Sequence, residues 1–315
     1  MQVFRSLAEA AGKLGPSAVA IGNFDGVHLG HQRLFEVARQ AAGTFGGAAV
    51  ALTFDPHPGK VLSPSLAPRL LTTLDRKLEL LAEAGLQAAV VQTFDAEFST
   101  LEAERFARDY LLAGLGARAV AVGPDFSFGR GRAGNVERLR AWLDPNATVS
   151  VVPKVEVDGL PVSSTRIREL VLEGRASAAA RLLGRPFDID GQVVTGMGRG
   201  RGIGWPTANV APLGELLPAI GVYAVRAQGA FGDLAGAANL GRKPTFGEGQ
   251  PVTVEVHLID YDGTGQASLT GQSMRVMFVE RLRAEMRFAS IEALTAQIGR
   301  DVVEARRLAM PPRLP

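Results

Sequence analysis

The chain has 315 residues, enough for one large domain or two ordinary ones, each with its own hydrophobic core. It carries 34 Lys and Arg residues against 32 Asp and Glu residues, spread evenly along the chain, so no basic surface for a nucleic acid is expected. The lack of cysteine excludes disulfides, thiolate metal sites and cysteine nucleophiles.

The N-terminal segment lacks the pattern of a signal peptide, and no apolar run reaches the ~18 residues that a membrane span needs. We therefore expect a soluble, cytoplasmic protein that binds neither membrane nor nucleic acid. The sequence leaves self-association open.

The first part of the chain alternates apolar runs with helical patterns. Buried strands are expected at 17–22, 46–54, 87–94 and 117–123, with a further strand near 148–153. Apolar residues at helical spacing predict helices at 31–42, 74–85, 99–114, 164–173 and 176–183. Ser99 or Thr100 is the expected N-cap of the third helix. Strands separated by helices pair in parallel through right-handed crossovers, which predicts a doubly wound α/β sheet.

The pattern changes after residue 184. Candidate strands follow one another without helices at 187–196, 221–228, 234–241, 252–259 and 273–282, with Gly, Pro and Asp between them. This arrangement favours an antiparallel β-barrel, followed by one long amphipathic helix at 290–310. We therefore predict an N-terminal domain at 1–184 and a C-terminal domain at 185–315.

The segment GNFDGVHLGHQ (22–32) lies where the first strand runs into the first helix. Open α/β sheets bind ligands at this edge, and a helix N-terminus offers unpaired N–H groups to an anion. His28 and His31 share one helix face, which suits nucleotide phosphates. Two alternatives remain open: the histidines could only cap and solvate the helix, or they could belong to a zinc site, although the usual HExxH pattern is absent.

Three further segments are expected at the same edge of the sheet or beside it. They are TFDPHPG (53–59) after the second strand, GPDFSFGRGRAGN (123–135) after the fourth, and SSTRIREL (163–170) at a helix start. Each alone would be a turn, a loop or a cap. Together they provide candidate residues for a nucleotide pocket, namely His57, Asp125, Phe126, Arg132, Ser164, Thr165 and Arg168.

The Gly-rich segment GMGRGRGIGWPTANV (196–210) predicts a second anion site, because small residues let backbone N–H groups approach a phosphate. An RNA-binding Arg-Gly segment is a minor alternative, since the stretch is short. Thr207 and Asn209 place two oxygen ligands on one side of an extended segment, which suits magnesium. Glu255 and His257 share one face of a predicted strand, where a charged residue is by default only solvated.

These motifs, taken in order, resemble two known modules. GxFDGxHxGHQ, TFxPHP, GxDFxFGxxRxG and SSTxIR look like the adenylyltransferase module of bacterial bifunctional FAD synthetases. GRPF, GRGRGIGWPTAN, LPAIGVYAV, NLGRKPTFG, TVEVHL and LRAEMRF resemble the riboflavin kinase module. Between them the two modules account for nearly the whole chain.

The resemblance implies a two-step enzyme that uses ATP and Mg²⁺. Its C-terminal domain would phosphorylate riboflavin to FMN. In its N-terminal domain, the FMN phosphate would attack the α-phosphorus of a second ATP, releasing pyrophosphate and forming FAD. No covalent enzyme intermediate is needed, because positioning and charge stabilisation supply the catalysis.

The resemblance also implies a role for each matched residue. In the adenylyltransferase, ATP would contact Gly22, Asn23, Phe24, Asp25, His28, His31, Ser164, Thr165 and Arg168. Of these, His28 and His31 would be catalytic. FMN would contact His57, Asp125, Phe126 and Arg132. In the kinase, ATP would contact Gly198, Gly200, Gly204, Pro206, Thr207 and Asn209, the last two also holding Mg²⁺. Glu255 would be the catalytic base, and Arg283 and Phe288 would contact the flavin.

Three positions depart from the usual family pattern: Thr270 replaces a tyrosine, Trp205 a phenylalanine and Asn135 a frequent aspartate. They bear on flavin packing and leave the proposed catalytic groups intact. Two other classes of function fit the scaffold: a flavin-responsive binding protein with silent sites, and a tRNA-binding relative of class I aminoacyl-tRNA synthetases, which share the HxGH signature. The intact catalytic motifs argue against the first, and the missing KMSKS-like loop and basic anticodon domain argue against the second.

Overall fold

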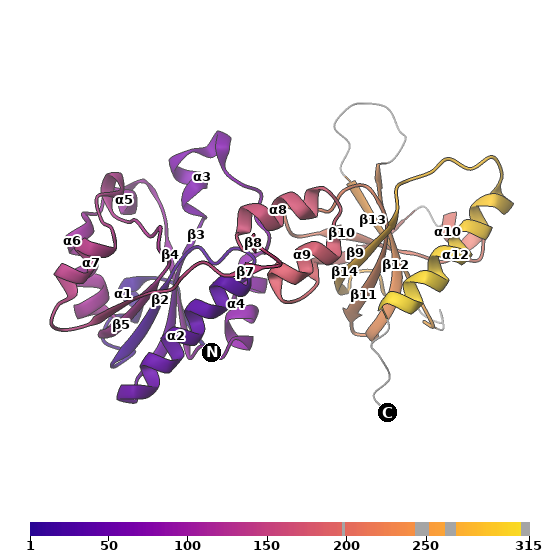
Figure 1. The fold of residues 1–315 in the computed structure, drawn as a ribbon. Helices are drawn as coiled ribbons and strands as arrows, with labels where there is room; N and C mark the ends of the chain where they lie inside the picture. The colour runs from indigo at the N-terminus through magenta and orange to yellow at the C-terminus, as the bar shows by residue number, and fades with distance from the viewer. Residues whose placement is uncertain (197–198, 243–251, 262–268, 310–315) are drawn as a thin grey trace. The chain divides into compact units, whose positions relative to one another are not determined.

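The computed structural model describes residues 1–196, 199–242, 252–261 and 269–309 (Figure 1). The chain divides into two compact units. The first consists of Met1–Arg69 and Leu74–Ser163, and the second of Leu70–Thr73 and Ser164–Pro315.

The first unit is built on a parallel sheet with the strand order β1-β4-β3-β2-β5-β6. The strands are β1 Gln2–Phe4, β2 Ser17–Ile21, β3 Ala48–Asp55, β4 Ala88–Thr93, β5 Ala117–Val122 and β6 Thr148–Val151. Every pair of neighbours is parallel, which confirms the predicted doubly wound class. The order reverses between β2 and β5, so the carboxyl ends of these strands form the switch point where such sheets bind ligands.

Helices and turns connect the strands of this sheet. The helices are α1 Leu7–Ala10, α2 Leu29–Phe45, α3 Pro58–Leu62, α4 Leu74–Glu83, α5 Ala96–Ser99, α6 Ala103–Arg105 and α7 Val136–Leu143. A π-helix, η2, spans Phe106–Gly114, and short 3₁₀ turns lie at Pro64–Leu66 (η1) and Arg130–Arg132 (η3). A small hairpin joins β7 Glu156–Val157 to β8 Leu160–Pro161.

The two faces of the sheet differ in side-chain size because consecutive strand residues point to opposite faces. On one face, alanines of β2, β3, β4 and β5 leave room for Leu34 and Phe35 of α2 and for Leu80 and Leu81 of α4. On the other face, valine, leucine and isoleucine from the same strands pack against η2 and α7. Both faces are buried, as the continuous apolar strand runs predict.

The predicted helix over 99–114 is divided into α5, α6 and η2. The expected cap at Ser99 or Thr100 is wrong, because Asp95 caps α5 four residues earlier by accepting a hydrogen bond from the Phe98 N–H at 2.7 Å. The Ser99 and Thr100 hydroxyls instead donate to carbonyls of α5, at its C-terminal end.

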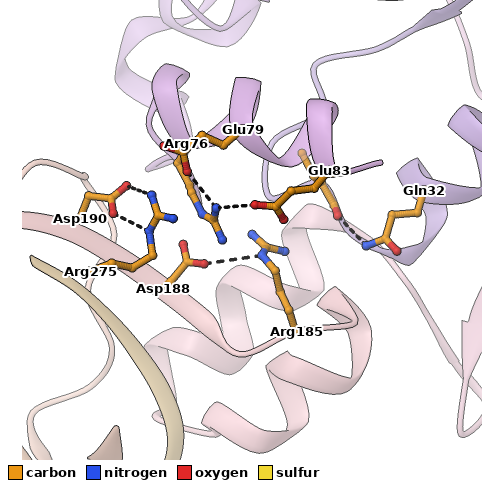
Figure 2. A network of polar contacts seen from close by, with 9 residues as sticks. Gln32, Arg76, Glu79, Glu83, Arg185, Asp188, Asp190 and Arg275 are labelled. Carbon is orange, nitrogen blue, oxygen red and sulfur yellow. Dashed lines mark hydrogen bonds and ion pairs between the residues drawn. The ribbon is translucent and has the colours of Figure 1, made fainter. Parts of the chain in front are cut away.

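The described strands of the second unit form a closed antiparallel barrel in the order β10-β13-β12-β11-β14-β9, as predicted. They are β9 Phe187–Val194, β10 Ala208–Pro212, β11 Gly221–Gly229, β12 Gly232–Arg242, β13 Val252–Leu258 and β14 Ser273–Arg283. β10 was not expected, because it is short and follows directly on the Gly-rich segment. Asp190 and Arg275, paired across β9 and β14, are joined by an ion pair of 2.6 Å (Figure 2).

Four helices are described in this unit: α8 Ser164–Leu172, α9 Ala176–Leu183, α10 Arg199–Gly202 and α12 Ile291–Ala309. The last confirms the predicted C-terminal helix and lies along the barrel (Figure 1). Its Val302 and Ala305 pack with Ala224 of β11 and Ala235 of β12.

The predicted placement of α8 and α9 with the sheet differs from their contacts. Both helices belong to the second compact unit, in which α8 contacts α9 and α9 contacts β9 and β14. A boundary between functional domains at residue 184 stays a prediction.

Candidate functional sites

The loop between β2 and α2 forms the first site. Phe24 (φ 48°) and Val27 (φ 44°) both adopt left-handed backbone conformations, which non-glycine residues rarely do. Such strain persists only where neighbouring contacts fix it. The fully buried Phe24 ring packs edge-on against Phe35 and His31, and Gln32 Nε2 donates to the Val27 carbonyl at 3.0 Å. Because these contacts enclose its ring, Phe24 can contact a nucleotide only through its backbone.

His28 and His31 lie together at the N-terminus of α2. Their rings are stacked with centroids 3.5 Å apart, which confirms that they share one face. His28 is the N-cap, and its Nδ1 accepts a hydrogen bond from the His31 backbone N–H at 3.3 Å. The capping alternative therefore holds for His28. In the neutral ring this bond places the proton on Nε2, which makes Nε2 a donor.

The His31 ring is held in an environment that disfavours its own positive charge. Burial, followed by the neighbouring His28 and Lys77, lowers the pKa of His31 well below its ordinary value. Its Nδ1 is enclosed and has no hydrogen-bond partner among the residues that the structure describes. A buried polar atom without a partner costs free energy in the folded protein.

Lys77 of α4 is a residue of this site that the sequence did not reveal. Its side chain is only 6% exposed, and burial lowers the pKa of its ammonium group. The carboxylates of Asp25 and Asp55 oppose this shift, so both lie close enough to interact with the charge. Asp25 is itself buried, with 3% exposed. The helical pattern predicted α4 but carried no signal that this lysine turns inward.

A cavity of about 540 Å³ opens beside the loop, and six predicted residues line it: Gly22, Asn23, His57, Asp125, Phe126 and Arg132. Further phenylalanines, at positions 54, 94, 98, 106 and 128, give it aromatic walls. The Phe126 and Phe128 rings are stacked with centroids 5.1 Å apart. An apolar cavity with a few polar groups at one side suits a flat aromatic ligand that carries a phosphate.

Polar groups around this cavity are held by specific contacts. His57 Nδ1 accepts from the Gly59 N–H at 3.1 Å. Its Nε2 lies 3.2 Å from the side-chain nitrogen Nδ2 of Asn23. Asp125 forms a 2.6 Å ion pair with Lys154, a partner that the sequence did not suggest.

The remaining residues predicted for the first site belong to the second compact unit. Ser164, Thr165 and Arg168 lie in the first part of α8, in the second compact unit. Their predicted contact with ATP stays a prediction. In the part of the chain that the structure describes, no group of three or more His, Asp or Glu side chains is arranged to hold a metal ion.

The second site is a cavity of about 490 Å³ in the barrel unit. Five predicted residues line it: Gly200, Thr207, Glu255, Arg283 and Phe288. Gly204 (φ 82°) and Pro206 lie in the segment leading to Thr207, and Gly198 falls outside the described residues. The segment 200–207, strand β13 and the segment 283–288 therefore line the same cavity.

Strand register places a row of polar side chains beside this cavity. Asn209 of β10 is the cross-strand partner of Glu255 on β13, and Glu255 is the partner of Asn239 on β12. Cross-strand partners share a face of the sheet, so the three side chains are neighbours. Asn239 also lines the cavity, and the sequence did not single it out. The Asn209 amide lies against Gly196, where a Cβ atom would be 1.9 Å from its nitrogen.

Arg283 lies at the edge of the same cavity but is already paired. Its Nη2 and Nε contact Asp301 of α12 at 2.8 and 3.0 Å, and its guanidinium lies 5.7 Å from the centre of the Phe288 ring. A buried carboxylate such as Asp301 needs this charge. Arg283 therefore fastens α12 to the barrel beside the predicted flavin contact.

Comparison with known proteins matches each site to a family. The FAD synthetase family model matches residues 11–166, and the riboflavin kinase model matches residues 183–309. A curated bifunctional riboflavin kinase/FMN adenylyltransferase from Pseudomonas fluorescens is 37% identical over 99% of both chains. The protein of that name from Escherichia coli K12 is 38% identical over 91% of both chains.

A solved structure is also similar over nearly the whole length. It is described as a macrolide-efflux protein from Streptococcus pneumoniae, with a TM-score of 0.85 and 31% identity over 97% of this chain and 98% of that chain. Within the described residues, no helix is both long enough and apolar enough to span a membrane.

Proposed function

Because this chain belongs to the family of bifunctional riboflavin kinases/FMN adenylyltransferases, we propose that its two cavities divide the two reactions between them. The C-terminal domain phosphorylates riboflavin to FMN with ATP, and the N-terminal domain adenylylates FMN to FAD with ATP and releases pyrophosphate. One observation carries the assignment of sites: each family model spans one cavity and its candidate catalytic residues.

In the adenylyltransferase site, the FMN phosphate attacks the α-phosphorus of ATP. A bond forms between a phosphate oxygen and this phosphorus as the bond to the pyrophosphate oxygen breaks. The attacking group is already an anion, so catalysis needs orientation and stabilisation of charge on the leaving pyrophosphate. The His28 and His31 rings at the N-terminus of α2 supply the donors, and the aromatic cavity holds the flavin ring.

Ser164, Thr165 and Arg168 complete this site by contacting ATP phosphates. Support comes from the FAD synthetase model, which extends to residue 166 and so includes both hydroxyls. Their place at the start of α8 gives them a helix N-terminus, which is favourable for an anion.

In the kinase site, Glu255 accepts the proton of the attacking riboflavin hydroxyl. A hydroxyl is a poor nucleophile at neutral pH, and a carboxylate at this position increases its reactivity as the γ-phosphoryl group is transferred. Thr207 and Asn209 would hold Mg²⁺, since both offer uncharged oxygens and Asn209 is the cross-strand partner of Glu255. When bound, Mg²⁺ would neutralise charge on the ATP phosphates. A cytoplasmic location and the absence of a nucleic-acid partner stay predictions.

Replacing Glu255 with Gln tests this assignment. The amide keeps the shape of the side chain but cannot accept the proton, so phosphorylation of riboflavin should slow by ~10²–10⁴. The same variant given FMN and ATP should still form FAD, because that reaction uses the other cavity. Chromatography of the flavin products measures both rates.

Glu280→Gln is the matched control. Glu280 is also a carboxylate on a barrel strand, but its side chain does not line the cavity. It should retain kinase activity. Normal kinase activity in Glu255→Gln would remove this residue from the mechanism. Loss of FAD formation from FMN as well would indicate that the two cavities do not work independently.

A further inference from the structure

His257 lies on β13, two residues after Glu255, and lines the same cavity. The alternation of a strand places both side chains on one face. The phosphoryl transfer described above requires no group on this ring. Its contacts, however, reach the segment that carries Thr207.

The hydrogen bond of His257 fixes its proton. Nδ1 lies 2.8 Å from the carbonyl oxygen of Pro206, and a carbonyl can only accept, so Nδ1 carries a hydrogen in both the neutral and the charged ring. Within the described part of the chain, this carbonyl is the only hydrogen-bond partner of the ring. Pro206 directly precedes Thr207, so the bond acts one residue away from the proposed magnesium ligand.

This bond continues the strand pairing beyond its end. The ladder between β10 and β13 starts with Ala208 opposite Val256, so Thr207 falls opposite His257 just outside it. Pro206 has no N–H to donate, so its backbone can bond to β13 only through its carbonyl, and this carbonyl accepts from the His257 side chain. Among the described residues, the ladder between β10 and β13 does not extend to Pro206.

The other side of the same segment is fixed by Trp205. Its ring stands edge-on to His257, with centroids 5.2 Å apart, and packs with the apolar cluster beneath α12. Its backbone N–H donates to the Gly200 carbonyl at 2.9 Å. The segment 205–207 is therefore anchored at Trp205 and, through His257, at Pro206.

We propose that His257 is a positioning residue of the kinase: its Nδ1–H holds the Pro206 carbonyl and thereby places the Thr207 hydroxyl at the cavity beside Glu255. The inference rests on the proposed role of Thr207 as a ligand of Mg²⁺ bound to ATP. Loss of the bond lets this segment shift. MgATP should then bind less tightly and align less well, while the riboflavin side of the cavity stays intact.

Three variants test the role of the Nδ1 donor. Asn places an amide nitrogen near the position of Nδ1, Gln places one near Nε2, and Phe has no donor. We expect His257→Gln and His257→Phe to lower kcat/KM for MgATP by about 5–10-fold, the effect of one lost hydrogen bond. His257→Asn should stay close to wild type, and KM for riboflavin should not change in any of the three. The unchanged KM for riboflavin also reports that the barrel of each variant is folded.

The inference is overturned if His257→Phe keeps the wild-type kcat/KM for MgATP, or if Asn, Gln and Phe impair it equally. Thr207→Val, assayed for its Mg²⁺ requirement, separates this failure from failure of the premise. If Thr207→Val keeps the wild-type Mg²⁺ dependence, the ligand role of Thr207 fails and the inference fails with it. If Thr207→Val loses that dependence while the His257 variants behave as wild type, only the inference fails.

Discussion

At the scale of single residues, His31 links the first site to the stability of the unit that holds it. Burial, with His28 and Lys77 nearby, lowers the pKa of His31 in the folded protein. The unfolded chain binds the same proton near the ordinary value of about 6.5. The unfolded state therefore binds more protons as the pH falls through this range, and acid favours unfolding.

We expect the contribution of His31 to stability to be present above pH ~6.5 and to be lost as the pH falls below it. His31→Asn should therefore flatten the dependence of the unfolding free energy on pH in the acidic range. Trp142 lies in the first unit and Trp205 in the second, so urea unfolding followed by tryptophan fluorescence in a Trp205→Phe background reports the sheet alone. An unchanged slope in the His31→Asn variant would show that this ring does not carry the linkage.

Several residues of each cavity could be predicted because they belong to contiguous motifs. Asn23, His28 and His31 follow one another in the loop after β2, and Thr207 and Glu255 lie on segments with a recognisable pattern. Lys77, Lys154 and Asn239 could not be predicted in the same way. Their roles depend on which side of a helix or strand faces the site and on partners far away in sequence.

At the scale of elements, the Gly-rich segment shows how closely backbone and site are coupled. A Cβ atom on Gly200 would lie 2.2 Å from the Trp205 carbonyl oxygen, far inside contact distance, whereas one on Gly202 would meet nothing within 4 Å. Both glycines lie on α10. Substitutions at these two positions form a matched pair, because only a side chain at Gly200 would collide with the segment that carries Thr207.

Gly200→Ala should displace segment 205–207 and lower the rate of riboflavin phosphorylation by about 10²-fold, the effect of a misplaced reacting group. Gly202→Ala should leave that rate close to wild type. Steady-state kinase assays of the two variants provide the comparison. Equal rates would show that the close approach of α10 to Trp205 does not position the site.

Element types were predictable where periodicity is strong, as in β2, α2 and α12, because burial imposes the pattern on the sequence. The errors have local causes. Asp95 caps a helix earlier than the hydroxyl residues that were expected to do so. β10 is too short to show alternation, and the partners of α9 are set by contacts that a helical pattern does not reveal.

At the scale of the whole molecule, the two cavities described above lie in different compact units, each with its own candidate catalytic groups. The fold classes follow from composition and pattern, since alternating strands and helices give a parallel sheet and consecutive strands give a barrel. We propose that each cavity serves its own reaction and that FMN made at one is the substrate of the other.

Chromatography of the flavins formed from riboflavin, ATP and Mg²⁺ tests this claim most directly, using His31→Ala, Glu255→Gln and a mixture of the two. His31→Ala should accumulate FMN, because losing a donor to a transition-state charge costs ~10²–10³ in rate. Glu255→Gln alone should leave riboflavin unchanged, and the mixture should form FAD. FAD formed at the wild-type rate by His31→Ala alone, or its absence from a mixture whose components each keep their other activity, would contradict the account.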